Sequence, residues 1–254
     1  MPITIKRLIS RLISTVAPKH LSANIKDEPR MFYMELTEIL KARRSVRAYQ
    51  DKAVDPALLR DIFTLAQQAP SNCNSQPWHV SVVSGDARDR LEAELIKRVS
   101  NGQAPVSAFK PYDVGFVGDF KERQISCAVE LWNAVGITRD DREARNDLFL
   151  DNWRFFGAPH VAFIAMPLNM GEGNALDVGI YLQTLMLLMV DHGLSCCPQG
   201  ALALYPEPVF EIAQIPENYG LLCGLSFGYA DMNASKNKLK MPRLSVDEAV
   251  TFIS

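Results

Sequence analysis

The chain has 254 residues, of which 48% are hydrophobic and 22% charged, and its formal net charge is −2. This composition is typical of a globular protein with a sizeable core, and the absence of a basic excess argues against nucleic-acid binding. The five cysteines are odd in number and include an adjacent pair, which indicates reduced thiols in the cytoplasm rather than a disulfide framework.

Residues 1–30 form an extension with an amphipathic pattern. Apolar residues recur at helical spacing over residues 3–16, and Lys6, Arg7 and Arg11 fall on other faces. The segment lacks the continuous apolar region and cleavage site of a signal peptide. Three interpretations remain open: a helix with weak contact to a membrane surface, an arm on a partner subunit, or an ordinary helix packed on its own domain.

Residues 31–254 are interpreted as one domain with more helices than strands. Asp55 and Pro56 are typical of a helix start, and Gly193 is typical of a helix end. Helices are predicted at 31–49 (running into a basic turn), 55–69, 85–101, 123–136, 140–155, 174–193 and 206–215 and near the C-terminus, and strands at 79–84, 158–166 and 219–230. The helix at 174–193 is expected to be a buried core helix, because its longest apolar block is far shorter than the roughly 20 residues of a membrane span.

Three familiar functional patterns are not supported. GLSFG, 224–228, matches the nucleophile elbow of hydrolases, which needs a catalytic histidine after the serine, whereas all four histidines precede Ser226. A buried strand with small residues is the better interpretation. No two histidines have the ligand spacing of a metal site, and no glycine pattern completes a dinucleotide fingerprint.

Two basic clusters lie at opposite ends of the domain. KARRSVRAY contains Arg43, Arg44, Ser45 and Arg47, and NKLKMPR contains Lys240 and Arg243. The first cluster alone would indicate an exposed basic surface. Together the clusters could neutralise a phosphate dianion, for which arginine offers two parallel hydrogen bonds.

A polar loop follows the helix at 55–69. In QAPSNCNSQPWHV, 67–79, the asparagine and glutamine amides can both donate to and accept from the edge of a heterocycle, and the prolines stiffen the loop. CCPQGALA, 196–203, adds Gln199 and Gly200, and the glycine permits close approach of a flat ligand. The sequence therefore predicts a ligand with a phosphate at one end and a polar heterocycle at the other.

Cys73, Cys196 and Cys197 are expected to be small buried hydrophobic residues.

These segments together resemble the nitroreductase family of FMN enzymes over residues 35–254. RRSVRAY is similar to its R-x-S-x-R/K-x-F/Y motif, APSNCNSQPW to its P-S-x-x-N-x-Q-P-W loop, and ALDVGIYLQTLMLLMVDHGLSCCPQG to its central helix and following loop. LLCGLSFGYAD and NKLKMPR resemble its last strand and phosphate-binding tail. CPQG and the N-x-L-x-x-x-R tail point to the nitrobenzoate-reductase-like branch. The resemblance implies an α+β fold, a three-layer α/β/α sandwich with a central mixed sheet, and an intertwined homodimer.

The resemblance also implies the site residues. One subunit would bind FMN through Arg43, Arg44, Ser45, Arg47, Gln199, Gly200, Lys240 and Arg243, and the other would contribute Pro70, Ser71, Asn72 and Asn74. Arg43, Lys240 and Arg243 would contact the phosphate. Arg47 would face the pyrimidine edge of the flavin, and the Gly200 N–H would lie near N5.

The implied activity is that of an oxidoreductase. NADH or NADPH would transfer hydride to flavin N5 and leave, and a nitroaromatic or quinone acceptor would take its place in a ping-pong cycle. The alternatives are enone reduction, reductive dehalogenation, flavin binding without turnover, and a membrane-associated scaffold that acts through the N-terminal helix. The segment 102–122 is the candidate acceptor-site lid, through Phe109, Tyr112, Phe116 and Phe120, although each aromatic could equally be a hydrophobic anchor.

Overall fold

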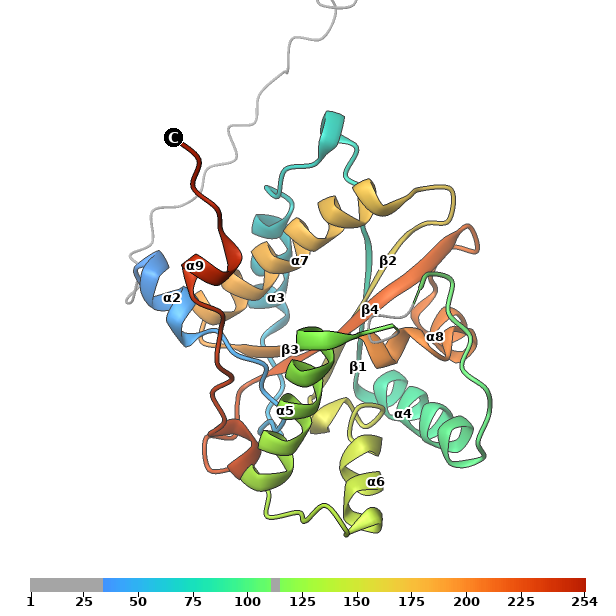
Figure 1. Ribbon diagram of the computed structural model, residues 1–254. Coiled ribbons are helices and arrows are strands. Elements are labelled where there is room, and N and C mark those ends of the chain that lie inside the picture. The colour runs from blue at the N-terminus through green and yellow to red at the C-terminus, as the bar shows by residue number, and fades with distance from the viewer. Residues whose placement is uncertain (1–33, 111–114) are drawn as a thin grey trace, which may run out of the picture. The chain divides into compact units, whose positions relative to one another are not determined.

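The computed structural model describes residues 34–110 and 115–254, which belong to one compact unit, Met34–Ser254 (Figure 1). The predicted amphipathic segment at 3–16 and the candidate lid residue Tyr112 lie outside the described residues.

The described unit is built on a four-stranded sheet with strand order β1-β2-β4-β3. Its strands are β1 (His79–Ser84), β2 (His160–Pro167), β3 (Ser195–Gln199) and β4 (Tyr219–Gly228). All three strand pairings are antiparallel, so the expectation of a mixed sheet is wrong for the described strands. The one parallel contact among the described residues is an isolated bridge between Ser45 and Cys196.

Eight α-helices and four short 3₁₀ helices surround the sheet in the described residues. The α-helices are α2 (Leu36–Ala42), α3 (Pro56–Ala66), α4 (Gly85–Ser100), α5 (Gly118–Ala134), α6 (Arg142–Leu150), α7 (Glu172–Asp191), α8 (Pro206–Ala213) and α9 (Val246–Ala249). The 3₁₀ helices are η1 (Asn72–Asn74), η2 (Phe155–Gly157), η3 (Gly200–Ala203) and η4 (Ser235–Asn237). Each predicted helix and strand of 31–254 is present, mostly shorter by a few residues. The strand β3 was not predicted, because its five residues SCCPQ contain a proline and follow a helix closely.

Local signals in the sequence explain where α3 and α7 begin and end. The Asp55 carboxylate accepts the Ala57 N–H at 2.9 Å, and Pro56 occupies the first turn of α3, as predicted. Gly193 follows α7 with φ +74°, a left-handed conformation that glycine adopts without strain. The chain then continues directly into β3, which begins only a few residues after the end of α7.

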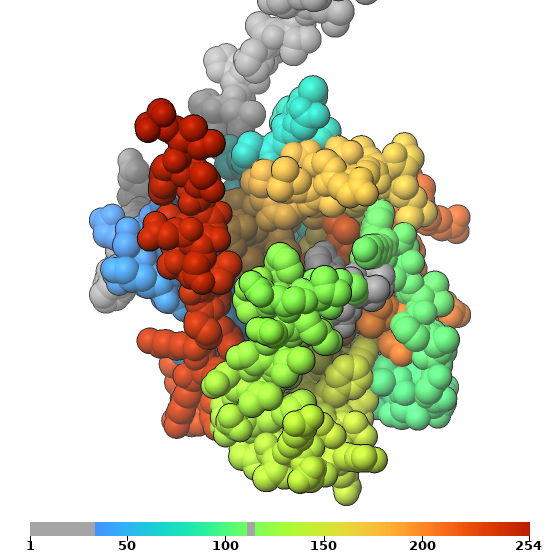
Figure 2. All heavy atoms as spheres, in the orientation of Figure 1, coloured from blue at the N-terminus to red at the C-terminus, as the bar shows by residue number. Residues whose placement is uncertain are grey.

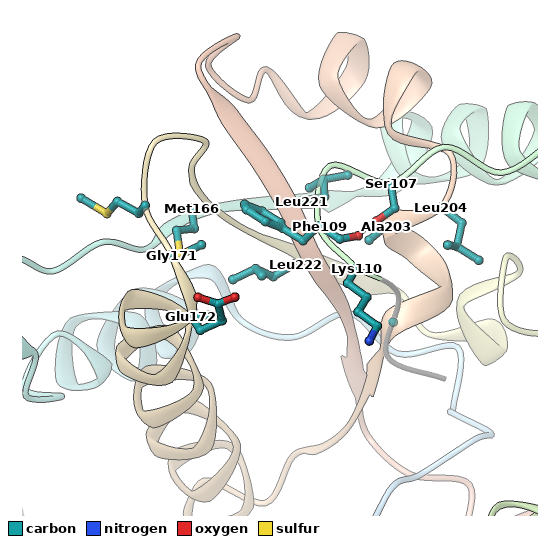
Figure 3. A pocket seen from close by; sticks show the side chains of 13 residues that line it. Ser107, Phe109, Lys110, Met166, Gly171, Glu172, Ala203, Leu204, Leu221 and Leu222 are labelled. Carbon is teal, nitrogen blue, oxygen red and sulfur yellow. Dashed lines mark hydrogen bonds between the residues drawn. The ribbon is translucent and has the colours of Figure 1, made fainter. Parts of the chain in front are cut away.

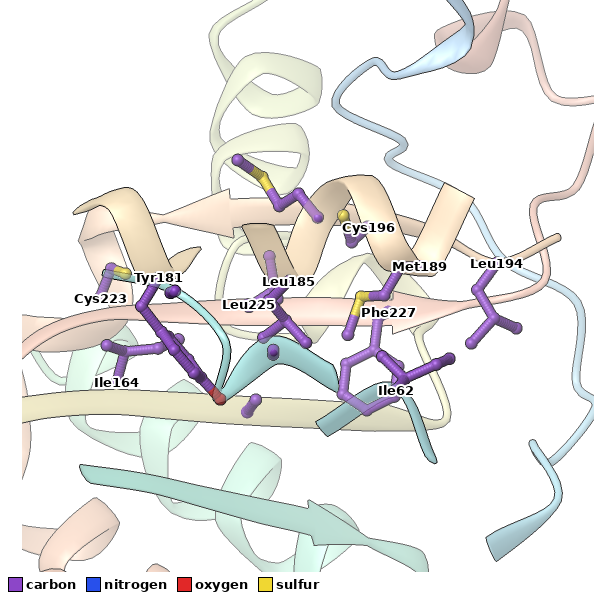
Figure 4. Packing of buried hydrophobic residues seen from close by; sticks show 14 of the residues in the cluster. Ile62, Ile164, Tyr181, Leu185, Met189, Leu194, Cys196, Cys223, Leu225 and Phe227 are labelled. Atoms are coloured by element: carbon purple, nitrogen blue, oxygen red, sulfur yellow. The ribbon is translucent and has the colours of Figure 1, made fainter. Parts of the chain in front are cut away.

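The core consists of two layers, one on each face of the sheet. Alternate residues of β2 point to opposite faces, so Ala162 and Ile164 join one cluster and Val161 and Phe163 join the other. The first cluster packs the sheet against α3 and α7 through Ile62, Tyr181, Leu185, Met189, Leu225 and Phe227 (Figure 4). The second packs it against α4 and α8 through Leu91, Leu95 and Val209. This arrangement confirms the predicted three-layer α/β/α sandwich.

The long helix α7 is a core helix, as expected, but only one of its sides is buried. Tyr181, Leu185 and Met189 face the core, whereas Leu176 and Ile180 remain 67% and 37% exposed. α7 is also the one helix of the described residues whose length and apolar character would suffice to cross a membrane, a property that core helices share.

Candidate functional site

A basic cavity of about 500 Å³ joins the two predicted basic clusters. It is lined by Arg44, Ser45, Arg47, Arg123, Ser126, Cys127, Leu239, Met241, Pro242, Arg243 and Leu244. The lining comes from the turn after α2, from α5 and from the C-terminal tail, which runs beside α5 on the molecular surface (Figure 2). Residues almost 200 positions apart in the chain thus share one cavity.

Asn237 fastens the two ends of the domain together. Its carbonyl oxygen Oδ1 accepts the backbone N–H of Arg47 at 2.7 Å, and its amide nitrogen Nδ2 donates to the carbonyl oxygens of Ala48 and Asp231, each at 2.8 Å. The side chain is 2% exposed. Sequence reasoning assigned it no role, although a buried asparagine with three hydrogen bonds determines where the basic turn lies.

The basic cavity has the electrostatic character of an anion site. Arg44, Arg47, Arg123 and Arg243 contribute four guanidinium groups, and the lining contains no carboxylate. Within the described part of the chain, none of the four forms an ion pair. They contact neutral groups instead: Arg44 donates to Met232 Sδ at 3.5 Å, and Arg243 donates to the Met241 and Pro242 carbonyls. Such guanidiniums are available to a phosphate.

The Arg47 guanidinium lies over the ring of Phe156. The guanidinium carbon lies 5.9 Å from the centre of the Phe156 ring, a distance typical of a cation–π contact. Phe155 and Phe156 have φ angles of 53° and 54°, so two bulky residues adopt the left-handed region in succession. Each costs on the order of 1–3 kcal/mol, and strain of this kind tends to occur near functional sites.

The basic turn is attached to β3, one of the two edge strands of the sheet. Ser45 bridges Cys196, and the Val46 N–H donates to the Cys196 carbonyl at 3.1 Å. Gly200 follows directly after the strand. β3 therefore runs from its contact with the basic turn at Cys196 to Gly200 at its other end.

The two thiols at the start of β3 are structural. Burial raises the pKa of Cys196 to about 12, and burial also raises the pKa of Cys197 although the Arg47 charge opposes this. Both therefore remain protonated near neutral pH and act as small buried hydrophobic residues, as expected. Cys73 is exposed, so the same expectation is wrong for that residue.

The amide loop, residues 70–76, has an unusual backbone. Cys73, Asn74 and Gln76 have φ angles of 51°, 55° and 47°, so three non-glycine residues out of four adopt the left-handed region. The Gln76 N–H donates to Ser71 Oγ at 2.9 Å, and the Asn72 N–H donates to Asp177 Oδ1 on α7 at 3.1 Å. These two hydrogen bonds hold the loop in a backbone conformation that is unfavourable in free energy.

The amide loop lies apart from the basic cavity within one chain. None of its residues lines that cavity, and the side chains of Asn72 and Asn74 are exposed. The loop is anchored by Trp78, which follows it: this ring stacks on Tyr181 of α7 with ring centres 4.8 Å apart and donates to Gln67 Oε1 at 3.0 Å. The chain presents the loop outward.

Comparison with known proteins identifies this arrangement. The sequence matches the Nitroreductase family over residues 40–229, which include the basic turn, the amide loop, α7 and β3. The nitroreductase NfnB of Mycolicibacterium smegmatis is 42% identical over 215 residues, 84% of this chain and 91% of the relative. The 4-nitrobenzoate reductase of Pseudomonas putida is 33% identical, with 81% and 89% covered. The structure of the FMN-dependent nitroreductase NfnB from Mycobacterium smegmatis in complex with NADPH aligns with a TM-score of 0.82 at 40% identity, covering 86% of this chain and 98% of that one. The chain belongs to the nitroreductase family.

Four of the eight residues expected on the first side of the nitroreductase cofactor site cannot be placed in the basic cavity. Arg43 and Lys240 do not line it, and both remain predictions as phosphate ligands. The Gln199 side chain is 4% exposed, donates from Nε2 to the Asn152 carbonyl at 2.8 Å and accepts from Ser226 Oγ, so only its backbone is free to contact a flavin. Gly200 lies at the opposite end of β3.

Ser226 has a structural role in this nitroreductase fold. It is fully buried in β4, and its hydroxyl is committed to Gln199. The interpretation of GLSFG as a buried strand is thereby confirmed. Of the four histidines, His160 is likewise structural: its Nε2 accepts the Val54 N–H at 3.0 Å and its Nδ1 lies 2.5 Å from Ser84 Oγ.

A second, apolar cavity of about 340 Å³ begins at Gly200. It is lined by Ser107, Phe109, Lys110, Met166, Met170, Gly171, Glu172, Ala175, Gly200, Ala203, Leu204, Leu221 and Leu222 (Figure 3). Of the aromatic residues proposed for the acceptor lid, Phe109 lines this cavity. Phe116 and Phe120 are exposed and line no cavity described for this chain, and Phe120 instead contacts the Arg123 guanidinium at 4.8 Å. Apart from Phe109 and Gly200, sequence reasoning did not single out these cavity residues, because they come from five separate segments.

Proposed function

We propose that this protein is an FMN-dependent oxidoreductase that uses NADPH or NADH to reduce nitroaromatic acceptors. The observation that carries the proposal is the basic cavity, which offers four guanidiniums without ion pairs among the described residues, in a chain of the nitroreductase family. The relatives are named for nitroaromatic reduction, and one was solved with NADPH. NADPH is therefore the first donor to test.

The residues present fit an FMN group. A cavity of about 500 Å³ lies within the range of small-molecule sites, and its cations complement a phosphate. Arg44, Ser45, Arg47 and Arg243 would hold the cofactor there, with Arg43 and Lys240 as further phosphate ligands. Gly200, at the far end of β3, would contact the ring through its backbone N–H.

The chemistry divides between cofactor and protein. FMN supplies a ring that can accept hydride from a nicotinamide and deliver it to an acceptor. The protein binds and orients the reactants, and Arg47 keeps a positive charge beside the cofactor, which favours an electron-rich ring. The Phe156 ring limits the positions that the Arg47 guanidinium can adopt.

A second copy of the chain would complete the site. The amide loop presents its Asn72 and Asn74 side chains outward and lines neither cavity, while α7 exposes Leu176 and Ile180. Large exposed apolar residues on a packed helix favour an interface. We propose a homodimer in which the Pro70, Ser71, Asn72 and Asn74 segment of one subunit reaches the FMN of the other. Five free thiols suit a reducing cytoplasm.

An absorption spectrum tests the proposal directly. The purified protein should show a flavin spectrum that bleaches on anaerobic addition of NADPH or NADH and returns on addition of a nitroaromatic acceptor. A protein that cannot be reconstituted with FMN would rule out the cofactor. A bound flavin that neither nucleotide reduces would instead favour flavin binding without turnover.

A further inference from the structure

The first half of α7 carries exposed and buried residues side by side. Leu176 and Ile180 are exposed, whereas their chain neighbours Asp177 and Tyr181 are 6% and 0% exposed. We propose that Asp177 is a positioning residue: together with Tyr181 it clamps the amide loop, so that the amides of the loop are oriented for the FMN of the other subunit. The inference rests on the proposed function, because it assigns the support of the same cofactor site.

One turn of α7 holds both ends of the amide loop. Near its start, Asp177 Oδ1 accepts the Asn72 N–H at 3.1 Å. At its end, Tyr181 stacks on Trp78, with ring centres 4.8 Å apart and ring planes 19° apart. Residues four apart in a helix lie on the same face, so both contacts come from one side of α7. A large movement of the loop would therefore break at least one of them.

The Asp177 side chain has no other contact that would account for its burial. Among the described residues it forms no ion pair, and its second oxygen, Oδ2, is buried without a hydrogen-bond partner. A buried acidic side chain with an unsatisfied oxygen is unfavourable for the fold by itself. The hydrogen bond to the loop backbone is therefore the contribution that explains an acidic residue at this position.

The amide loop needs such support because its backbone is strained. Cys73, Asn74 and Gln76 all adopt positive φ angles, and the side chain of Asn74 is exposed. Without support the loop would populate relaxed conformations, and ligand binding would have to supply the free energy of ordering it. Asp177 lowers that cost and so raises FMN affinity without touching the cofactor.

Titration of the apoprotein with FMN tests the clamp. Asp177→Ala should lower FMN affinity by about fivefold, as for the loss of one hydrogen bond. Asp177→Asn should restore the affinity, because the amide oxygen can accept the same N–H. Val178→Ala, which truncates a buried neighbour that packs in the core, is the matched control and should lower the melting temperature without changing FMN affinity.

Two results of this titration would overturn the inference. They are an unchanged FMN affinity in Asp177→Ala, and an equal loss of affinity in Asp177→Ala and Asp177→Asn. Asp177→Val, which fills more of the site than alanine, replaces the alanine variant if that protein does not fold.

A double-mutant cycle distinguishes positioning from a general loosening of α7. Asn74→Gly removes an amide that the clamp is proposed to present, so the two losses should not be independent. The variant that combines Asn74→Gly with Asp177→Ala should stay well below the roughly 25-fold loss that two independent fivefold effects would give. A combined loss of roughly 25-fold would overturn the inference.

Hydrogen exchange observes the clamp in the apoprotein. The Asn72 N–H should exchange faster in Asp177→Ala than in the wild type or Val178→Ala, because it has lost its acceptor. Equal exchange in all three proteins would overturn the inference. A wild type that binds no FMN would overturn the proposed function and with it the cofactor role of Asp177, whereas a wild type that binds FMN no better than Asp177→Ala would overturn the inference alone.

Discussion

The basic cavity and the amide loop differ in how complete a ligand site each can make within one chain. The cavity brings together four guanidiniums from the turn after α2, α5 and the tail, and Asn237 fastens that arrangement with three hydrogen bonds. The amide loop concentrates backbone strain in Cys73, Asn74 and Gln76 but lines no cavity described here. One region is a recess that can surround a phosphate, and the other is a projection.

This difference indicates which kind of binding partner suits each region. A recess lined by four guanidiniums suits an anion, whereas a strained projection with exposed amides suits contact with another surface. Strain that is maintained in an exposed loop has to be compensated by the surrounding structure, here through Asp177 and Trp78. Variants at Ile180, Arg47 and Asn74 can break or sharpen the comparison, and a variant at His160 tests a site outside both regions.

The largest effect is expected from Ile180→Asp on the exposed side of α7. A carboxylate in an apolar interface would lose its hydration without a partner, so the dimer should dissociate. If the amide loop reaches the partner's cofactor, FMN affinity should fall by about 100-fold, equivalent to about 2.7 kcal/mol. Light scattering and FMN fluorescence titration measure the two effects. Val82→Asp, at an exposed apolar residue of β1, is the control; a monomer that retains full FMN affinity would refute the shared site.

Arg47→Ala should weaken the basic cavity itself. Loss of a charged hydrogen-bond donor is worth about 1.5–3 kcal/mol, or roughly 10-fold to 100-fold in FMN affinity. The fold should persist, because Asn237 binds the Arg47 backbone rather than its side chain. Titration of the apoprotein with FMN measures the change, and Arg90→Ala on the exposed surface of α4 should have no effect. Full flavin occupancy in the Arg47 variant would contradict the site assignment.

Asn74→Gly isolates the amide from the backbone of the loop. Glycine adopts the φ of 55° without strain, so stability should be equal or higher while FMN affinity falls by about fivefold, as for the loss of one hydrogen bond. Asn74→Ala should show the same loss of affinity together with a lower melting temperature. Identical FMN affinity in wild type and the glycine variant would remove the loop from the cofactor site.

The smallest effect concerns His160, which belongs to neither region. Burial lowers its pKa below the ordinary value of 6.5, so the unfolded chain binds a proton more readily than the folded one. The contribution of His160 to the free energy of unfolding is therefore fully present above pH 6.5 and declines as the pH falls below that value, by at most about 1.4 kcal/mol per pH unit. Urea unfolding at several pH values measures the slope. His160→Gln should flatten the slope without altering FMN affinity.

Much of the fold could be predicted because its signals are local. The Asp55 cap, the helical spacing of α3 and the apolar runs of β2 and β4 each lie within a short window. β3 was missed because a proline and two cysteines in five residues do not make a strand pattern, and its single neighbour β4 decides its conformation. The antiparallel order of the sheet likewise depends on pairings between segments far apart in the chain.

The candidate site shows the same division. The sequence by itself determined the types of residue available: arginines for a phosphate, amides for a heterocycle, and a glycine for close approach. Only the tertiary structure decided that Arg123 joins the first group, that the Gln199 side chain turns into the core, and that the amide loop stands apart from the arginines. The physical reason is that side-chain chemistry belongs to each residue, whereas burial, hydrogen-bond partners and neighbouring charges are set by segments that meet only when the chain folds.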